Sequence, residues 1–157
     1  MKLYLIRHAP ALKAQPGQAD QARALSEEGI RKFTEEVRGL QRLGVQFDRL
    51  YHSPMLRAVQ TAELLVPLLE GETEVTPYLA AAPGLELLEI LQGSSVGLVG
   101  HEPWMGELCA WLLTARPEGR AFPFKKGGVG LLEGPPQPGQ MKLLGFWAPR
   151  LLRRVGV

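Results

Sequence analysis

The sequence is poor in residues that form covalent or metal cross-links. Its 157 residues include a single cysteine, Cys109, and no asparagine. One cysteine excludes an intrachain disulfide and a multi-cysteine metal site. No run approaches the roughly 18 apolar residues of a membrane span, and the opening residues are too short and polar for a signal peptide. We therefore expect a protein of a reducing compartment, the cytoplasm, without membrane contact.

Net charge is also small. The formal net charge is +2, which is too little to predict a nucleic-acid-binding or membrane surface. The only aspartates are Asp20 and Asp48, so an aspartate-rich magnesium site is not expected. The length and the hydrophobic fraction of 45% predict one globular domain over residues 1–157, with a core that needs no cross-links.

The missing asparagine accompanies a skewed composition. There are 13 prolines, 27 leucines against three isoleucines, and 12 arginines against six lysines. Loss of thermolabile residues is typical of a thermophilic source, although a biased genome composition would produce the same skew.

Apolar runs alternate with helical patterns along the chain. Strands are expected over residues 2–6, 45–51, 74–78, 95–100, 129–132 and 142–147, and helices over 27–44, 54–69, 85–91 and 103–113, with a surface loop at 11–24. This alternation predicts an α/β fold with a mainly parallel central sheet, helices on both faces and an antiparallel edge strand. Ser26 and Ser53 are expected to cap two of the helices, and Pro54 to occupy the first helical position of the second.

Two basic segments, at residues 125–126 and 149–154, do not by themselves predict a binding function. Lys125 and Lys126 could line an entrance and steer an anionic partner, but a solvated loop is the expected alternative. The basic end at residues 149–154 is expected to be a solvated terminal segment rather than a contact tail.

Charged and nitrogenous side chains follow three predicted strands where each strand ends. Arg7 and His8 follow the first strand, Arg57 lies one turn into the helix after the second, and His101 follows the strand at 95–100. Because ligands bind outside the carboxyl ends of strands in open α/β sheets, these side chains are expected to face one crevice. Two arginines and two histidines without an acidic cluster predict a site for a dianion such as a phosphoryl group.

Three segments then occur in a distinctive order. They are Leu-Ile-Arg-His-Ala at 5–9, Ser-Pro-Met-Leu-Arg-Ala-Val-Gln-Thr at 53–61 and Val-Gly-His-Glu-Pro at 99–103. Together they resemble the histidine phosphatase superfamily, which has the phosphoglycerate-mutase-like fold, and within it the short SixA-type phosphohistidine phosphatases. The resemblance implies that His8 is a nucleophile forming a phosphohistidine intermediate. It also implies that Arg7, Arg57 and His101 bind the phosphoryl group, with no cofactor.

The residue chemistry agrees with that implication. A neutral imidazole can attack phosphorus and leave again, which splits one difficult displacement into two easier ones. Arg7, Arg57 and His101 can supply positioning and charge stabilisation without a metal. Ser53 and Glu102 are added as candidate substrate contacts, whereas His52, Trp104 and Cys109 are expected to pack.

The segment after the third predicted strand lacks the acid that mutase-like members of the family carry there. It reads Thr-Pro-Tyr-Leu-Ala-Ala-Ala-Pro at 76–83. A general acid contributes roughly 10²–10⁴-fold when the leaving group is poor, but the imidazole leaving from phosphohistidine is readily protonated. SixA-type members also lack that acid. Glu86, Glu89 and Glu102 remain candidate substitutes, with a helix-terminal role the expected alternative for Glu102.

Three functions remain open at this point. The leading hypothesis is a phosphatase acting on phosphohistidine of a protein. The second is a phosphomonoesterase acting on a small sugar or nucleotide phosphate with the same nucleophile. The third is a non-catalytic phosphate-binding module. In each case the partner is phosphorylated, and neither nucleic acid nor membrane is expected.

Overall fold

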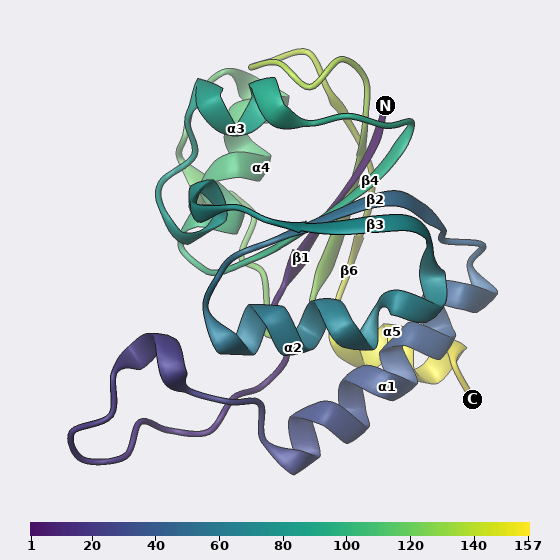
Figure 1. The fold of residues 1–157 in the computed structure, drawn as a ribbon. Coiled ribbons are helices and arrows are strands. Elements are labelled where there is room, and N and C mark those ends of the chain that lie inside the picture. Colours follow the sequence, from purple (N-terminus) through teal and green to yellow (C-terminus); the bar gives the residue numbers. More distant parts are fainter.

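The computed structural model describes all of residues 1–157, arranged around one six-stranded sheet (Figure 1). The strands are β1 (Lys2–Arg7), β2 (Phe47–His52), β3 (Leu69–Val75), β4 (Ser95–Gly100), β5 (Val129–Glu133) and β6 (Lys142–Trp147). Their order across the sheet is β3-β2-β4-β1-β5-β6. The four strands from β3 to β1 are parallel, and β5 and β6 are antiparallel additions. The predicted sheet is confirmed, and the last two strands form its antiparallel edge.

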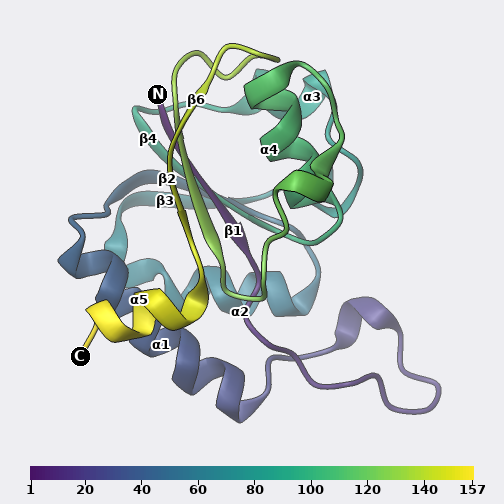
Figure 2. The same cartoon turned by 180° about the vertical axis from the view of Figure 1, so that it is seen from behind.

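Helices cover both faces of the sheet because the side chains of β1 alternate between two cores. Tyr4 and Ile6 pack in one core beneath α1 (Glu27–Arg42), α2 (Leu56–Leu64) and α5 (Pro149–Val155). Leu3 and Leu5 pack in the other core beneath α3 (Leu85–Ile90) and α4 (Trp104–Thr114). Figures 1 and 2 show these two helical layers from opposite sides. None of the helices combines the length and the apolarity that crossing a membrane requires.

The helix cap at Ser26 is as predicted, since its Oγ accepts a hydrogen bond of 2.9 Å from the Gly29 amide. Two other boundaries were predicted wrongly. The third strand is Leu69–Val75 rather than residues 74–78, because it is an exposed edge strand without an apolar run. The second helix is shorter at both ends. It ends at Leu64, and a 3₁₀ turn containing Pro67 follows.

The basic end is not a solvated segment, so that prediction was wrong. Residues Pro149–Val155 form α5, which packs along α1. Leu152 is fully buried there, and Gly39 of α1 lies against the backbone of Leu152, with no room for a side chain. Apolar contacts between elements far apart in sequence therefore order this end. Arg150 and Arg154 are exposed, whereas Arg153 lies 3.5 Å from Glu36 of α1.

Candidate active site

The carboxyl ends of β2, β4 and β1 meet at one edge of the sheet. Arg7 lies opposite Gly100 across the β1–β4 pair, and His52 lies opposite Val99 across the β2–β4 pair. The His8 amide donates to Gly100 O at 3.0 Å, and the Ser53 amide donates to Val99 O at 3.1 Å. The ladder thus continues one residue beyond the strands, which sets His8, Ser53 and His101 side by side.

His8 is buried in a defined protonation state. Its Nδ1 lies 2.7 Å from Ala9 O, and the residue is only 5% exposed. A carbonyl can only accept, so Nδ1 carries the proton and Nε2 keeps its lone pair. Burial lowers the pKa of His8 to about 3, and the charges of His101, Arg57 and Arg7 act in the same direction. His8 is therefore a neutral imidazole at pH 7.

His101 lies next to His8, with ring centroids 5.1 Å apart. Its Nε2 lies 2.7 Å from Ser53 Oγ, and its Nδ1 is buried without a partner. Burial lowers the pKa of His101 to about 4, and the charge of Arg57 lowers it further. Trp104 packs edge-on against this ring at 6.2 Å. Because Nε2 is engaged by Ser53, Nδ1 is the ring nitrogen of His101 that remains to bind an anion.

Ser53 does not cap the following helix, so that prediction was wrong. The helix begins at Leu56, and the N-cap position belongs to Met55. The Ser53 hydroxyl instead accepts a hydrogen bond of 3.1 Å from the Met55 amide and bonds to His101. The chain bends at Pro54, so that Ser53 bonds to His101 and the helix begins only at Leu56.

Backbone carbonyl oxygens hold the guanidinium groups of both arginines, and a carboxylate also holds that of Arg57. Arg57 in the first turn of α2 has an 8% exposed side chain, and it donates to Asp20 O at 2.9 Å and to Asp20 Oδ2 at 3.1 Å. Arg7 donates to Phe124 O at 2.7 Å. The Nε atoms of both arginines are buried without partners. Burial lowers the pKa of Arg7, with Glu102 opposing and Arg57 assisting that shift.

Asp20 is the site residue that the sequence analysis missed. It lies in the loop between β1 and α1, where Arg23 donates to its Oδ1 at 3.1 Å while Arg57 holds Oδ2. These hydrogen bonds, first from Arg23 and then from Arg57, lower the pKa of the Asp20 carboxyl. The sequence analysis expected no acidic cluster at the site, and Asp20 adds one carboxylate there that it did not name. The loop has no periodicity, so nothing in the sequence could indicate where this carboxylate lies.

Thr61 was also missed as a positioning residue. Its hydroxyl donates to Arg57 O at 2.7 Å and accepts from the Ala9 amide at 3.0 Å. This contact ties the chain after His8 to the helix that carries Arg57. The signal was present, because Thr61 follows Arg57 by four residues and so lies on the same helix face.

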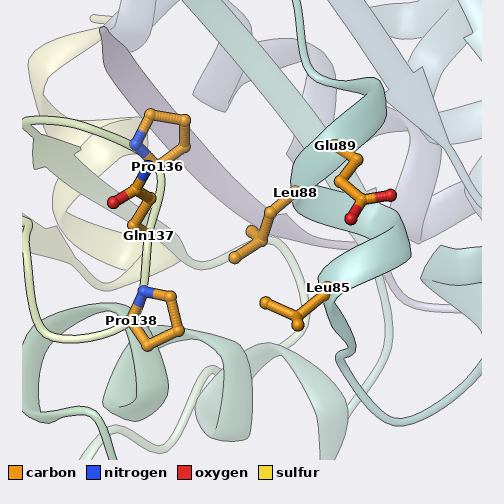
Figure 3. Close-up of a pocket in the computed structure, with 6 residues that line it drawn as sticks. All are labelled: Leu85, Leu88, Glu89, Pro136, Gln137 and Pro138. Carbon is orange, nitrogen blue, oxygen red and sulfur yellow. The ribbon is translucent and has the colours of Figure 1, made fainter.

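Two of the three candidate acids, Glu86 and Glu89, lie on α3 and form no hydrogen bond with the site histidines. Glu89 lines a cavity of about 440 Å³ between α3 and the turn at 136–138 (Figure 3). That turn lies at the amino end of β1, where the Gly134 amide donates to Met1 O at 3.0 Å. Glu86 is exposed on the same helix, and no hydrogen bond or ion pair joins it to the site.

Glu102 is the acid nearest to the site along the chain. Its Oε1 accepts from the Gly106 amide at 2.7 Å at the start of α4, and burial raises the pKa of Glu102. This is the helix-terminal role expected as the alternative. His52 and Cys109 pack as predicted: His52 bonds to the neighbouring carbonyl of Ser53 at 2.9 Å, and Cys109 is buried in a core. No group of three or more His, Cys, Asp or Glu residues could hold a metal ion.

Comparison with known proteins decides the family. Residues 3–82 match the sequence model of the histidine phosphatase superfamily (branch 1). The chain belongs to the histidine phosphatase superfamily. Members of this superfamily are phosphatases. A protein of uncharacterised function from Picosynechococcus sp. is 32% identical over 148 residues, which cover 85% of this chain and 86% of that protein.

Solved structures of this superfamily share the whole fold. The protein histidine phosphatase SixA, complexed with tungstate, is 25% identical, with a TM-score of 0.82 over 97% of this chain and 99% of that one. A protein of Agrobacterium tumefaciens assigned as the phosphohistidine phosphatase SixA is 24% identical, with a TM-score of 0.79 over 94% and 97% of the two chains. The alpha-ribazole phosphatase of Shigella flexneri, at 18% identity and a TM-score of 0.74 over 95% and 97%, shows the same fold alone.

Proposed function

We propose that this protein hydrolyses phosphohistidine on proteins through a covalent intermediate at His8. The observation that carries this proposal is the protonation state of His8, whose Nδ1 donates to Ala9 O and whose Nε2 lone pair is free. Burial keeps that ring neutral by lowering its pKa to about 3. A neutral, oriented imidazole is the form that can attack phosphorus.

The proposed reaction has two displacements. His8 Nε2 attacks the phosphorus atom, the bond from phosphorus to the substrate imidazole breaks, and that leaving nitrogen takes a proton from water. Water then attacks phosphorylated His8, which releases phosphate and restores the Nε2 lone pair. Arg7, Arg57 and the Nδ1 of His101 hold the oxygens of the transferring group, which is how charged and polar donors stabilise phosphoryl transfer.

Arg57 must first exchange its partner, because Asp20 occupies the guanidinium that the proposal gives to the phosphoryl group. Asp20 lies in an exposed loop, so its exchange for an incoming dianion needs no change in the core. The incoming dianion replaces the carboxylate and carbonyl contacts of Asp20 with charge-assisted hydrogen bonds of its own, which offsets their loss.

The state of the acids near His8 supports imidazole as the proposed leaving group. Glu102 is held by the Gly106 amide, and Asp20 is held ionised by Arg23 and Arg57. Neither carboxyl group is hydrogen-bonded to His8 or His101, so we expect activity to follow the ability of the leaving group to depart. Phosphoramidates and phosphohistidine peptides are expected to be cleaved about 10²–10⁴-fold faster than sugar or alkyl phosphates. A panel of kcat/KM values for phosphohistidine, aryl, sugar and nucleotide phosphates tests this, and equal rates on sugar phosphates would contradict it.

Two carboxyl groups bear on the second candidate, a small-molecule phosphomonoesterase: Glu102, whose pKa is raised by burial, and Asp20, which contacts Arg57. If Asp20 only competes for Arg57, then Asp20→Asn should tighten tungstate binding about fivefold, as expected for an ion pair with one exposed partner, and should leave turnover of phosphohistidine intact. If Asp20 protonates an alkoxide, the same change should reduce turnover of sugar phosphates about 10²-fold or more. Calorimetric titration with tungstate and the substrate panel distinguish these outcomes, with the exposed Glu118→Gln as control.

Physiological partners are proposed on the same basis. A phosphorylated protein is the preferred substrate class, and a small phosphorylated molecule is the alternative. The buried single cysteine, Cys109, supports the prediction of a reducing compartment such as the cytoplasm. The whole chain, residues 1–157, is taken as the functional domain.

A further inference from the structure

A second charged surface lies beside the candidate active site. A cavity of about 270 Å³ is formed between α1, the turn before β5 and the start of α5. We call it the basic groove, and its charged lining residues are Lys32, Glu36, Lys125, Lys126, Arg150 and Arg153. Neither Arg57 nor either site histidine belongs to this lining, so the groove is separate from the phosphoryl site.

The groove begins at the backbone that carries His8. Pro10 lines the groove two residues beyond His8. The Gly127 amide donates to Arg7 O at 3.1 Å and to His8 O at 3.0 Å, which ties the lysine-bearing turn to that backbone. Since β6 is parallel to β1, the start of α5 lies at the same edge of the sheet, as Figure 2 shows. A macromolecule that presents a group to His8 therefore has the basic groove at the same edge of the sheet, where its flanking residues can bind.

The positive charge of the groove is largely uncompensated. Lys125, Lys126 and Arg150 are exposed and form no ion pair, whereas Lys32 pairs with Glu28 at 2.9 Å. Glu36 is the one acid in the lining, and it lies 3.5 Å from Arg153. The residue is only 1% exposed, and its Oε2 has no partner. Burial raises the pKa of Glu36 to about 8, so at pH 7 it is mostly uncharged and cancels little of the surrounding positive charge.

Glu36 also packs against Gly127, the residue whose amide is hydrogen-bonded to the His8 backbone. Gly127 has a φ of +85°, and a Cβ there would lie 2.7 Å from Glu36 Oε2. The turn therefore rests directly on the Glu36 carboxyl, with no space for a side chain between them. The floor of the groove, the turn that carries Lys125 and Lys126, and the His8 backbone form one connected unit.

We propose that the basic groove binds an acidic segment of the phosphoprotein substrate, next to the phosphohistidine that enters the site. This inference rests on the proposed function and adds the chemical character of the protein that is recognised. Carboxylates of that segment pair with Lys125, Lys126 and Arg150 in solvent-exposed contacts. Contacts of this kind steer and orient a partner, and they weaken as salt is added.

Two synthetic peptides test the proposal. Both carry one phosphohistidine and have the same length, and one has four glutamates beside it where the other has four glutamines. At low ionic strength the protein should hydrolyse the glutamate peptide with a kcat/KM about fivefold higher, mainly through KM, as exposed ion pairs allow. The double variant Lys126→Glu/Arg150→Glu should lose this preference. It should retain hydrolysis of phosphoramidate and of the glutamine peptide within about twofold.

A matched variant controls for net charge. Arg38→Glu/Arg116→Glu makes the same change in charge at exposed residues that form no ion pair and do not line the groove, and it should keep the preference. The groove proposal is overturned if the parent hydrolyses both peptides equally, if the groove variant keeps the preference, or if the control loses as much. The proposed function fails instead, and the groove proposal with it, if the parent hydrolyses neither peptide.

Discussion

Replacing His8 by alanine is expected to reduce turnover of a phosphohistidine peptide by about 10⁴-fold or more, as the loss of a covalent nucleophile does. His101 is also a buried, neutral imidazole, but its Nε2 is engaged by Ser53 Oγ, whereas His8 is oriented by Ala9 O through its Nδ1. The thermal unfolding temperature should stay within a few degrees of the parent, because the ring contributes one hydrogen bond to its own neighbour and is not part of either apolar core.

His52→Ala is the matched control for that change. His52 ends β2, which is parallel to β1 and separated from it by β4. Its Nδ1 lies 2.9 Å from Ser53 O, a contact of the same type as that of His8 with Ala9 O. The His52 variant should retain turnover within a few-fold. Rapid quenching in alkali during turnover should trap a phosphoryl group on the parent and not on the His8 variant. Residual activity of the His8 variant within tenfold of the parent would exclude His8 as the nucleophile.

The second large effect is expected from Arg57→Ala, which should lower kcat/KM for phosphohistidine by about 10²–10³-fold, as the loss of one buried donor to a transition state does. Its guanidinium is buried, and besides two contacts to Asp20 it keeps an unpartnered Nε. Arg57→Lys should recover only part of the loss, since an ammonium cannot donate two parallel bonds. Steady-state kinetics on one peptide, with tungstate affinity measured alongside, gives both numbers.

Glu102→Gln is compared with Arg57→Ala to test whether Glu102 acts as a general acid. The amide keeps an oxygen that can accept from Gly106 N, so the fold should be intact and turnover should stay within a few-fold. A loss as large as that of Arg57→Ala, in a folded protein, would show that a general acid is present. The small-molecule phosphomonoesterase would then be the better function.

The convergence of the site was predictable from sequence because it depends on local signals and one topological rule. Three of the apolar runs end one residue before a nitrogenous side chain, and parallel strands bring such ends to one edge. The structure places His8 and His101 with ring centroids 5.1 Å apart on this basis. The antiparallel pairing of the last two strands was predictable in the same way, since a short turn joins them.

Long-range contacts explain what the sequence did not indicate. The hydrogen bond between Arg57 and Asp20 joins residues that are 37 positions apart in the sequence. Asp20 lies in a loop whose sequence shows no periodicity. α5 is ordered by burial of Leu152 against α1, and the basic composition of that segment masks its apolar face. β3 is held by backbone pairing with β2 at an exposed edge, where hydrophobic patterning is weak.

The position of β1 has a consequence for synthesis. It is the first strand to leave the ribosome, yet its neighbours in the sheet are β4 and β5, which are made of residues 95–100 and 129–133. β1 therefore cannot pair in the sheet until most of the chain has been synthesised. Pairing between segments so far apart in sequence slows folding. The His8 backbone is not held on both sides until Gly127 has emerged. A nascent or truncated chain that ends before this turn carries every side chain proposed for phosphoryl transfer, but it lacks the frame that aligns them.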